Sequence, residues 1–498
     1  MRRFPRRLQL VLVPTLWVLL ASAPGDRAVE VSIRQLRKAV APRGDGRHLL
    51  LLSSLRQLRD TSLRSFFQQL AQHGEPPLRV HAILGLAEIN ESGHIDPRLI
   101  AQLDSPMARH LVIASALDME LIDSGRINEL LRLDDLEPKS RVLLLAELVA
   151  RGEPVQTHTL TRLAGSQNLA TAALAACVAA QMGDDAALSS YRARVDTLRG
   201  SDRTRHLLEI FDAIAARKLT AVVDWVVQTV KEPNADPDVV AKGISTVLAL
   251  DPARGVRLWS RVLGDDPPYD KCVRYAHLLL ASGSRVPASA YDHLPAGDAV
   301  IDLLVRAGKA ISSGADPTGA LIELVELGHR QTTRRVMNIV EDLDDEQAAR
   351  VYLHLIDSVE GESRGRDPRA ETATIAAARL FRIDSDAVSN RLLRAEDDSL
   401  TQQVILMGLL ESPSPAAGDA ARLVKRIGFG QADSLAMILI AKHTPSLTAD
   451  ELQELGVIAS GGGRVSDMLQ MQAAWLYLKH TSTIERALVE TFAMAPPP

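Results

Sequence analysis

Apolar residues recur at helical spacing along most of the chain, and polar turns interrupt them. The pattern is most regular between residues 78 and 183, where four apolar stretches each end in a glycine: LRVHAILGLAEINESG, HLVIASALDMELIDSG, RVLLLAELVARG and LATAALAACVAAQMG. Apolar residues at positions i, i+3, i+4 and i+7 form one face of an α-helix. A glycine just past the end of a helix supplies the left-handed conformation that terminates it. The pattern therefore predicts four helices that end at Gly93, Gly125, Gly152 and Gly183.

A second, shorter amphipathic segment follows each of these glycines. In the first of them, IDPRLIAQLD, Ile95, Leu99 and Leu103 recur at helical spacing. The predicted unit is a helix, a glycine, a shorter helix and a polar turn. A period near 30 residues with two helices per unit is typical of an α-solenoid, in which each helix pair buries its apolar face against neighbouring pairs only. We therefore expect an all-α fold without a β-sheet, a solenoid of stacked antiparallel helix pairs.

The turns between the predicted units share a residue pattern. Residues 103–109 read LDSPMAR and residues 133–141 read LDDLEPKSR, with an aspartate in the turn, a proline, and an arginine that opens the next helix. This pattern resembles the HEAT-repeat family, most clearly over about residues 78–183. The resemblance implies a ladder of turn residues along the stack, formed by Asp104, Arg109, Asp135 and Arg141, with Arg79 as a possible earlier rung. Residues 165–168 contain neither an aspartate nor an arginine, so the ladder lapses there. A tetratricopeptide-like array is the alternative.

The predicted domain organisation follows from the change in regularity along the chain. After residue 200 the helical pattern of apolar residues continues, but the repeats are less evenly spaced. The pattern does not decide whether this region is a second domain. We expect a signal peptide or anchor at 1–23, a mobile linker at 24–46, HEAT-like repeats at 47–199, divergent helical repeats at 200–490 and a disordered tail at 491–498.

The N-terminus predicts export. MRRFPRR is basic, LQLVLVPTLWVLL is apolar, and Ala21-Ser22-Ala23 supplies small residues for cleavage. The apolar stretch is short for a membrane span, so we expect a cleaved signal peptide and an extracytoplasmic protein, either secreted or periplasmic. Because Pro24 would follow the cleavage site, membrane anchoring by this same segment is the alternative. The uncharged residues 163–183 are dominated by alanine, and we expect a buried helix there rather than a second span.

Composition agrees with helix packed on helix. Hydrophobic residues make up 46% of the 498 residues and aromatic residues only 3%, which disfavours strands. The net charge is −5 and both signs are interspersed, so the basic face that nucleic acid requires is not expected. The two cysteines, Cys177 and Cys272, would lie too far apart in a stacked array to form a disulfide. We expect two buried thiols.

No motif assigns a chemical task to any residue. The chain contains no H-E-x-x-H, no paired C-x-x-C, no phosphate-binding glycine motif and no G-x-S-x-G. The acidic run at 341–346 lacks the glycine and spacing of a calcium loop and is typical of a helix start. We therefore expect no catalytic residue, no cofactor and no metal site.

These observations favour a non-enzymatic exported scaffold that binds another protein or an envelope component, with the second helix of each unit lining the binding face. One alternative is a helical-toroid enzyme acting on polysaccharide, which would need aromatic platforms and paired carboxylates. The other is a purely structural spacer.

Overall fold

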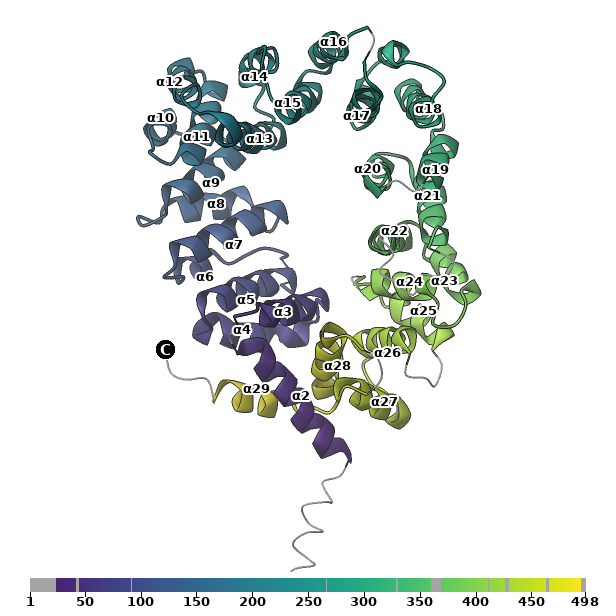
Figure 1. Ribbon diagram of the computed structural model, residues 1–498. Helices are drawn as coiled ribbons and strands as arrows, with labels where there is room; N and C mark the ends of the chain where they lie inside the picture. Colours follow the sequence, from purple (N-terminus) through teal and green to yellow (C-terminus); the bar gives the residue numbers. More distant parts are fainter. Residues whose placement is uncertain are drawn as a thin grey trace, which may run out of the picture. The chain divides into compact units, whose positions relative to one another are not determined.

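The computed structural model describes residues 24–41, 44–90, 92–265, 267–327, 330–359, 369–410, 412–425, 430–462 and 465–493. Over these residues the chain forms 28 α-helices, α2 to α29, and four 3-10 helices, η1 to η4, and no strand (Figure 1). The predicted all-α fold class is confirmed. The predicted signal peptide at 1–23 and residues 494–498 of the predicted tail lie outside the described residues.

The chain divides into two compact units. Unit 1 comprises the described residues up to Gly93 and from Ser385 onwards, and unit 2 comprises His94–Asp384. The helices of unit 1 are α2 (Pro24–Val40), α3 (Arg47–Gln57), η1 (Thr61–Leu63), α4 (Arg64–His73), α5 (Pro76–Glu88), α23 (Ser385–Arg394), α24 (Leu400–Leu410), α25 (Ala416–Val424), α26 (Gln431–His443), α27 (Ala449–Ala459), α28 (Asp467–His480) and α29 (Ile484–Phe492).

The helices of unit 2 follow one another without interruption along the chain. They are α6 (Pro97–Ala101), α7 (Pro106–Asp118), α8 (Ser124–Leu131), α9 (Pro138–Ala150), α10 (Thr157–Ala164), α11 (Leu169–Gln181), α12 (Asp185–Val195), α13 (Gly200–Ala216), η2 (Thr220–Val222), α14 (Val223–Val230), α15 (Pro237–Leu250), α16 (Pro252–Leu263), α17 (Tyr269–Leu280), η3 (Gly283–Arg285), η4 (Ala288–His293), α18 (Ala299–Ser313), α19 (Thr318–Glu326), α20 (Arg330–Val340), α21 (Asp345–Asp357) and α22 (Ala370–Ile383).

These units divide the chain at different places from the domain boundaries expected from sequence. Residue 199 lies inside unit 2, where α13 packs against both α11 and α15 and the packing has no break. Residues 24–46, interpreted as a mobile linker, include α2, on which Ile33, Leu36 and Ala39 are buried. Helix α2 contacts α27, α28 and α29. Helix α2 also contacts its neighbour α3, but most of the helices that cover its apolar residues lie far away in the sequence, which is why the sequence pattern did not reveal its packing.

From α7 to α15, every second helix of unit 2 contacts the helix two places further along. The contacts run from α7 to α9, then to α11, α13, α15 and α17, and Figure 1 shows the first four of these helices following one another along unit 2. Helix α11 is the most deeply buried: every residue from Thr171 to Ala180 is enclosed. The uncharged stretch 163–183 therefore contains a buried helix, as predicted. None of the helices in the described part of the chain is long and apolar enough to span a membrane.

In unit 1 the two ends of the chain share one core. The Trp475 indole N–H donates to Ser62 Oγ at 3.0 Å, and the ring of Phe66 lies 5.7 Å from that of Trp475. The Gln472 side-chain amide donates to the carbonyl oxygen of Ser54 at 2.8 Å. These hydrogen bonds join residues 413 and 418 positions apart. The expectation that each helix pair packs only against its sequence neighbours is therefore wrong for unit 1.

The ends of the long helices also differ in part from the prediction. Helix α9 ends as expected: Gly152 has a φ of +76°, and Glu153 N donates to Leu148 O at 2.9 Å, the bond that defines a Schellman motif. Helix α7 ends with the same bond, from Leu121 N to Ala116 O at 2.7 Å, but its left-handed residue is Glu120 with a φ of +57°. The predicted stop at Gly125 is wrong, because that glycine lies within α8.

Candidate functional site

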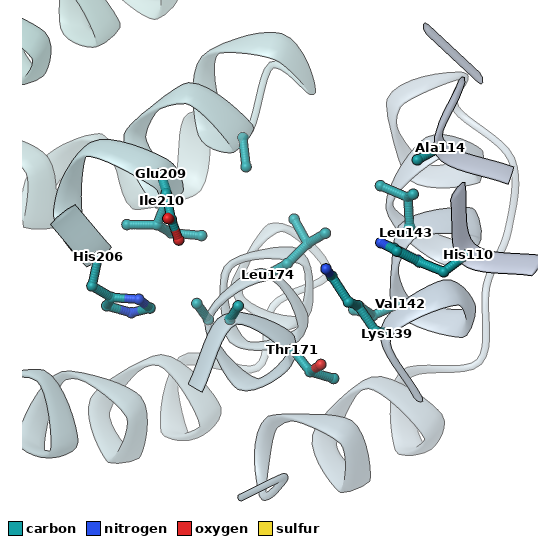
Figure 2. A pocket seen from close by; sticks show the side chains of 13 residues that line it. His110, Ala114, Lys139, Val142, Leu143, Thr171, Leu174, His206, Glu209 and Ile210 are labelled. Atoms are coloured by element: carbon teal, nitrogen blue, oxygen red, sulfur yellow. The ribbon is translucent and has the colours of Figure 1, made fainter. Parts of the chain in front are cut away.

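A hollow of about 250 Å³ lies across four consecutive long helices of unit 2, α7, α9, α11 and α13 (Figure 2). We call it the alanine pocket, because alanines on three of these helices leave space that larger side chains would fill. Its lining residues are His110, Ala114, Lys139, Val142, Leu143, Ala170, Thr171, Ala173, Leu174, His206, Glu209, Ile210 and Ala213. The long helices of three predicted units, α7, α9 and α11, line it together with α13. The face lined by the shorter second helices, which the sequence favoured for binding, is a different surface from this hollow.

Helix caps set which face of each helix points into the alanine pocket. Helix α7 starts at Ser105, whose hydroxyl accepts from Ala108 N at 3.3 Å, and α11 starts at Asn168, whose side chain accepts from Thr171 N at 3.0 Å. Helix α9 has a proline in its first turn. From these starts, residues three or four positions apart share a face. Ala170 and Leu174 of α11 therefore line the pocket together.

Two charged side chains lie at the alanine pocket, on either side of α11. Lys139 belongs to α9 and Glu209 to α13, and both residues are exposed. Within the part of the chain that the structure describes, neither makes an ion pair or a hydrogen bond. In Figure 2 the Leu174 side chain lies between the Lys139 ammonium and the Glu209 carboxylate. The pocket thus has an apolar centre with opposite charges at its two sides.

The two histidines of the pocket are held neutral near pH 7. His110 Nδ1 lies 3.2 Å from Ser140 Oγ. Burial lowers the pKa of His110, Lys139 lowers it further, and Glu137 opposes both. Burial likewise lowers the pKa of His206, with Glu209 opposing and Arg194 adding to the effect. The charge of the pocket lining therefore comes from Lys139 and Glu209.

The Ser140, His110 and Glu137 side chains contain the groups of a hydrolytic triad but not its arrangement. Ser140 Oγ donates to Glu137 Oε2 at 3.2 Å, and the serine is completely buried. A triad requires the serine proton to pass to the histidine, which the carboxylate orients. Here the serine proton is directed at the carboxylate instead. The three side chains connect α7 to α9, and a buried serine is not accessible to a substrate.

The residues predicted to form the turn ladder lie away from the alanine pocket. The Arg109 side chain is only 6% exposed, and its Nη1 lies 2.8 Å from Asp135 Oδ2. Arg141 donates instead to carbonyl oxygens of the turn before it, those of Leu131 at 2.9 Å and Leu133 at 2.8 Å. Asp104 is exposed in the turn before α7. The structure brings Arg109 and Asp135 together, and it places Arg141 on the backbone.

Arg79, the possible earlier rung, also contacts the backbone. Its Nε donates to the carbonyl oxygen of Ala71 at 2.9 Å. Arg79 and Arg141 thus each bind a carbonyl oxygen of the preceding turn, whereas Arg109 reaches the following one. None of the ladder residues touches the alanine pocket.

The tryptophans and cysteines among the described residues are buried in the structure. Trp225, Trp259 and Trp475 are buried in the cores, so none of them offers a platform for a sugar ring. Cys177 and Cys272 are buried in α11 and α17, and no disulfide joins them. Among the residues that the structure describes, no group of three or more His, Cys, Asp and Glu side chains is arranged to hold a metal ion.

Comparisons of the chain with protein-family models, with curated proteins and with solved structures found no match. The assignment of a function therefore depends on the geometry of the alanine pocket.

Proposed function

We propose that this chain is a non-enzymatic, exported helical-repeat scaffold that binds another protein, or a component of the cell envelope, at the alanine pocket of unit 2. The observation that carries the proposal is the apolar hollow with the unpaired charges of Lys139 and Glu209 at its sides. An apolar centre with a polar rim is the usual composition of a protein-binding patch. Pockets for whole small molecules are commonly about 300–1,000 Å³. A hollow of about 250 Å³ suits one side chain of a larger partner.

We further propose that unit 2 is a HEAT-like α-solenoid. Two kinds of contact support this arrangement: the packing of α7, α9, α11, α13 and α15 each on the helix two places further along, and ion pairs between residues about one repeat apart. Arg254 pairs with Asp224, Arg274 with Asp238, and Arg350 with Asp316, at sequence separations of 30, 36 and 34 residues. A stacked array presents long helix faces side by side. The alanine pocket extends over four such helices.

A peptide-display library selected on the purified full-length chain tests the binding function. We expect enrichment of peptides with an apolar anchor residue on the wild type. The Ala170→Phe variant places a ring in the pocket and should enrich none of them. Ala186→Phe is the matched control, because Ala186 is also exposed at the second position of its helix, α12, and lies outside the pocket. It should behave as wild type. Absence of enrichment, or equal enrichment on Ala170→Phe, contradicts the proposal.

The export part of the proposal rests on residues 1–23 and has a separate test. The chain produced in its own cells with a C-terminal tag is recovered by fractionation, and its N-terminus is read by mass spectrometry. Cleavage directly before Pro24 and recovery outside the cytoplasm support export of a soluble chain. Retention of residues 1–23 in a membrane fraction supports the anchor instead, and a cytoplasmic chain that keeps these residues contradicts both.

A further inference from the structure

The opposite charges on the two sides of the alanine pocket indicate that the partner carries charged groups as well as an apolar residue. The following inference rests on the proposed function and names the chemistry of the bound segment. We propose that the partner presents an extended segment in which an apolar anchor residue lies between an acidic group, which meets Lys139, and a basic group, which meets Glu209.

Several charged side chains near Lys139 and Glu209 are paired within the chain. Arg203 Nη2 lies 2.8 Å from Glu232 Oε1, and Arg205 Nη2 lies 2.5 Å from Asp202 Oδ1. Asp212 pairs with Lys242, and Glu137 lies 3.9 Å from Arg109 Nε. Lys139 and Glu209 have no such partner among the described residues, so their charges remain available to a ligand.

The order of the helices fixes the order of the two charges. Helix α11 contacts α9 on one side and α13 on the other. Lys139 on α9 and Glu209 on α13 therefore lie on opposite sides of Leu174 of α11, as Figure 2 shows. A segment whose anchor covers Leu174 extends toward both charges. Because the neutral histidines contribute no charge near pH 7, one flank of the anchor faces a cation and the other faces an anion.

A second hollow indicates that the segment continues past Glu209. This hollow of about 710 Å³ lies between α13 and α15, and Glu209 lines it together with polar residues such as Thr204, Asn234 and Asp236. Glu209 thus belongs to both hollows. An extended segment anchored in the alanine pocket has room beyond the basic group that meets this carboxylate. A compact molecule seated in the alanine pocket alone would not reach that space.

Three acetylated and amidated pentapeptides separate the charge proposal from the pocket itself: Asp-Ala-Leu-Ala-Lys, Asp-Ala-Leu-Ala-Asp and Lys-Ala-Leu-Ala-Lys. Titrations into the full-length chain are followed by the methyl NMR signals of Leu143, Leu174 and Ile210, which line the pocket. An exposed ion pair strengthens binding modestly, and a like-charge contact weakens it by a similar factor. We expect the mixed peptide to bind about three- to tenfold more tightly than either of the others.

Charge reversal should change this preference in a defined way. Lys139→Glu should bind Lys-Ala-Leu-Ala-Lys best, and Glu209→Lys should bind Asp-Ala-Leu-Ala-Asp best. The double variant restores opposite charges and should again prefer the mixed peptide, now in the reverse orientation. Glu129→Lys is the control, because Glu129 is exposed on α8 outside both hollows and should not alter the preference.

The possible outcomes distinguish the two proposals. If all three peptides shift the pocket methyls with equal affinity, or the variants keep the wild-type order, the charged flanks are wrong and the apolar anchor stands. If none of the peptides shifts these methyls and the library selection is also empty, the binding function itself is wrong.

Discussion

Unit 1 and unit 2 are both made of short packed helices, but they take their cores from different parts of the chain. Unit 2 is one continuous run, His94–Asp384, in which the main contacts join helices that lie close together along the chain. Unit 1 joins residues before Gly93 to residues after Ser385, and single hydrogen bonds cross more than 400 positions. The comparison shows that short helices build two kinds of core. One core is formed by helices close together in the sequence, and the other by helices from two distant segments.

The difference has a consequence for folding order. Contacts that are local in sequence form quickly, whereas long-range contacts form only after a large loop is closed. The Lys479–Asp60 pair, at 2.7 Å with the Asp60 side chain only 6% exposed, belongs to the second kind. We therefore expect unit 2 to be stable without unit 1. The two segments of unit 1 should be unstable without each other.

Separating the segments tests this difference most strongly. A fragment of residues 94–384 should keep its helical circular dichroism and melt cooperatively. A fragment of residues 385–498 should be largely unfolded, because Trp475 loses its contact with Phe66 and its hydrogen bond to Ser62. Mixing it with a fragment of residues 24–93 should restore helix in a concentration-dependent way. A fragment 385–498 that melts cooperatively alone would contradict the discontinuous core.

Two buried tryptophans provide the next largest effect. Trp475 in unit 1 and Trp259 in unit 2 are both 0% exposed, and each indole N–H is hydrogen-bonded, that of Trp259 to Tyr275 O at 2.9 Å. Replacement of either by alanine should cost about 3–5 kcal/mol of unfolding free energy. Calorimetry should show Trp475→Ala lowering only the transition of unit 1 and Trp259→Ala only that of unit 2. A single transition lowered equally by both variants would mean that the units unfold together.

Acid should destabilise both units through one histidine in each, the buried His277 in unit 2 and the partly buried His443 in unit 1. Burial is the largest effect that lowers the pKa of His443 in unit 1 and of His277 in unit 2, each to about 4 from 6.5. Nearby Lys442 and Lys479 lower the pKa of His443 further, and Arg335 does so for His277. Because the folded pKa lies below the unfolded value, the unfolded state binds the proton first. The stabilisation is complete above pH 6.5 and is lost as the pH falls toward 4.

The expected slope is up to about 1.4 kcal/mol per pH unit for each histidine. Denaturant titrations at several pH values between 7 and 4 measure it. His443→Gln should flatten the acid dependence of unit 1 alone, and His277→Gln that of unit 2 alone. Unchanged slopes in both variants would show that other groups cause the acid loss.

Helix ends in unit 2 give the smallest effect. Alanine in place of Gly152 should cost about 1 kcal/mol, because a side chain is strained at a φ of +76°. Glu120→Gly relieves the same strain and should stabilise by about 0.5–1 kcal/mol. Gly319→Ala is the control, because Gly319 lies within α19 without a positive φ and has no atom within 4 Å of the position of an added Cβ, so it should cause no loss. Thermal denaturation of the 94–384 fragment measures all three, and a destabilised Glu120→Gly variant would contradict the strain at that position.

The sequence pattern predicts the parts of this molecule whose partners are local. Helical periodicity predicts the all-α class. The buried helix at 163–183 and the turn residues Arg109 and Asp135 lie in the region where this periodicity is most regular. The packing of α2 was missed because most of its partners lie at the other end of the chain. The stop at Glu120 was missed because glycine, not glutamate, is the usual signal.

The alanine pocket was missed for a different reason. Ala114, Ala170 and Ala213 read as ordinary helix residues, and the hollow exists only because the packing of four helices places them together. The register between neighbouring helices is set by side-chain interdigitation that periodicity alone does not define. Small residues recurring on the face of successive long helices, beside unpaired charges such as Lys139, are the signal that would have indicated the site.

Unit 1 needs α28 as well as residues before Gly93. A polypeptide that ends before α28 therefore cannot fold this unit. A polypeptide released before Trp475 has been added lacks the residue that covers Phe66 and hydrogen-bonds Ser62. Such a product would expose aromatic residues and unfolded backbone to proteases, although its middle could already be native. Unit 1 therefore becomes resistant to proteases only after the ribosome has added α28, the helix that carries Trp475.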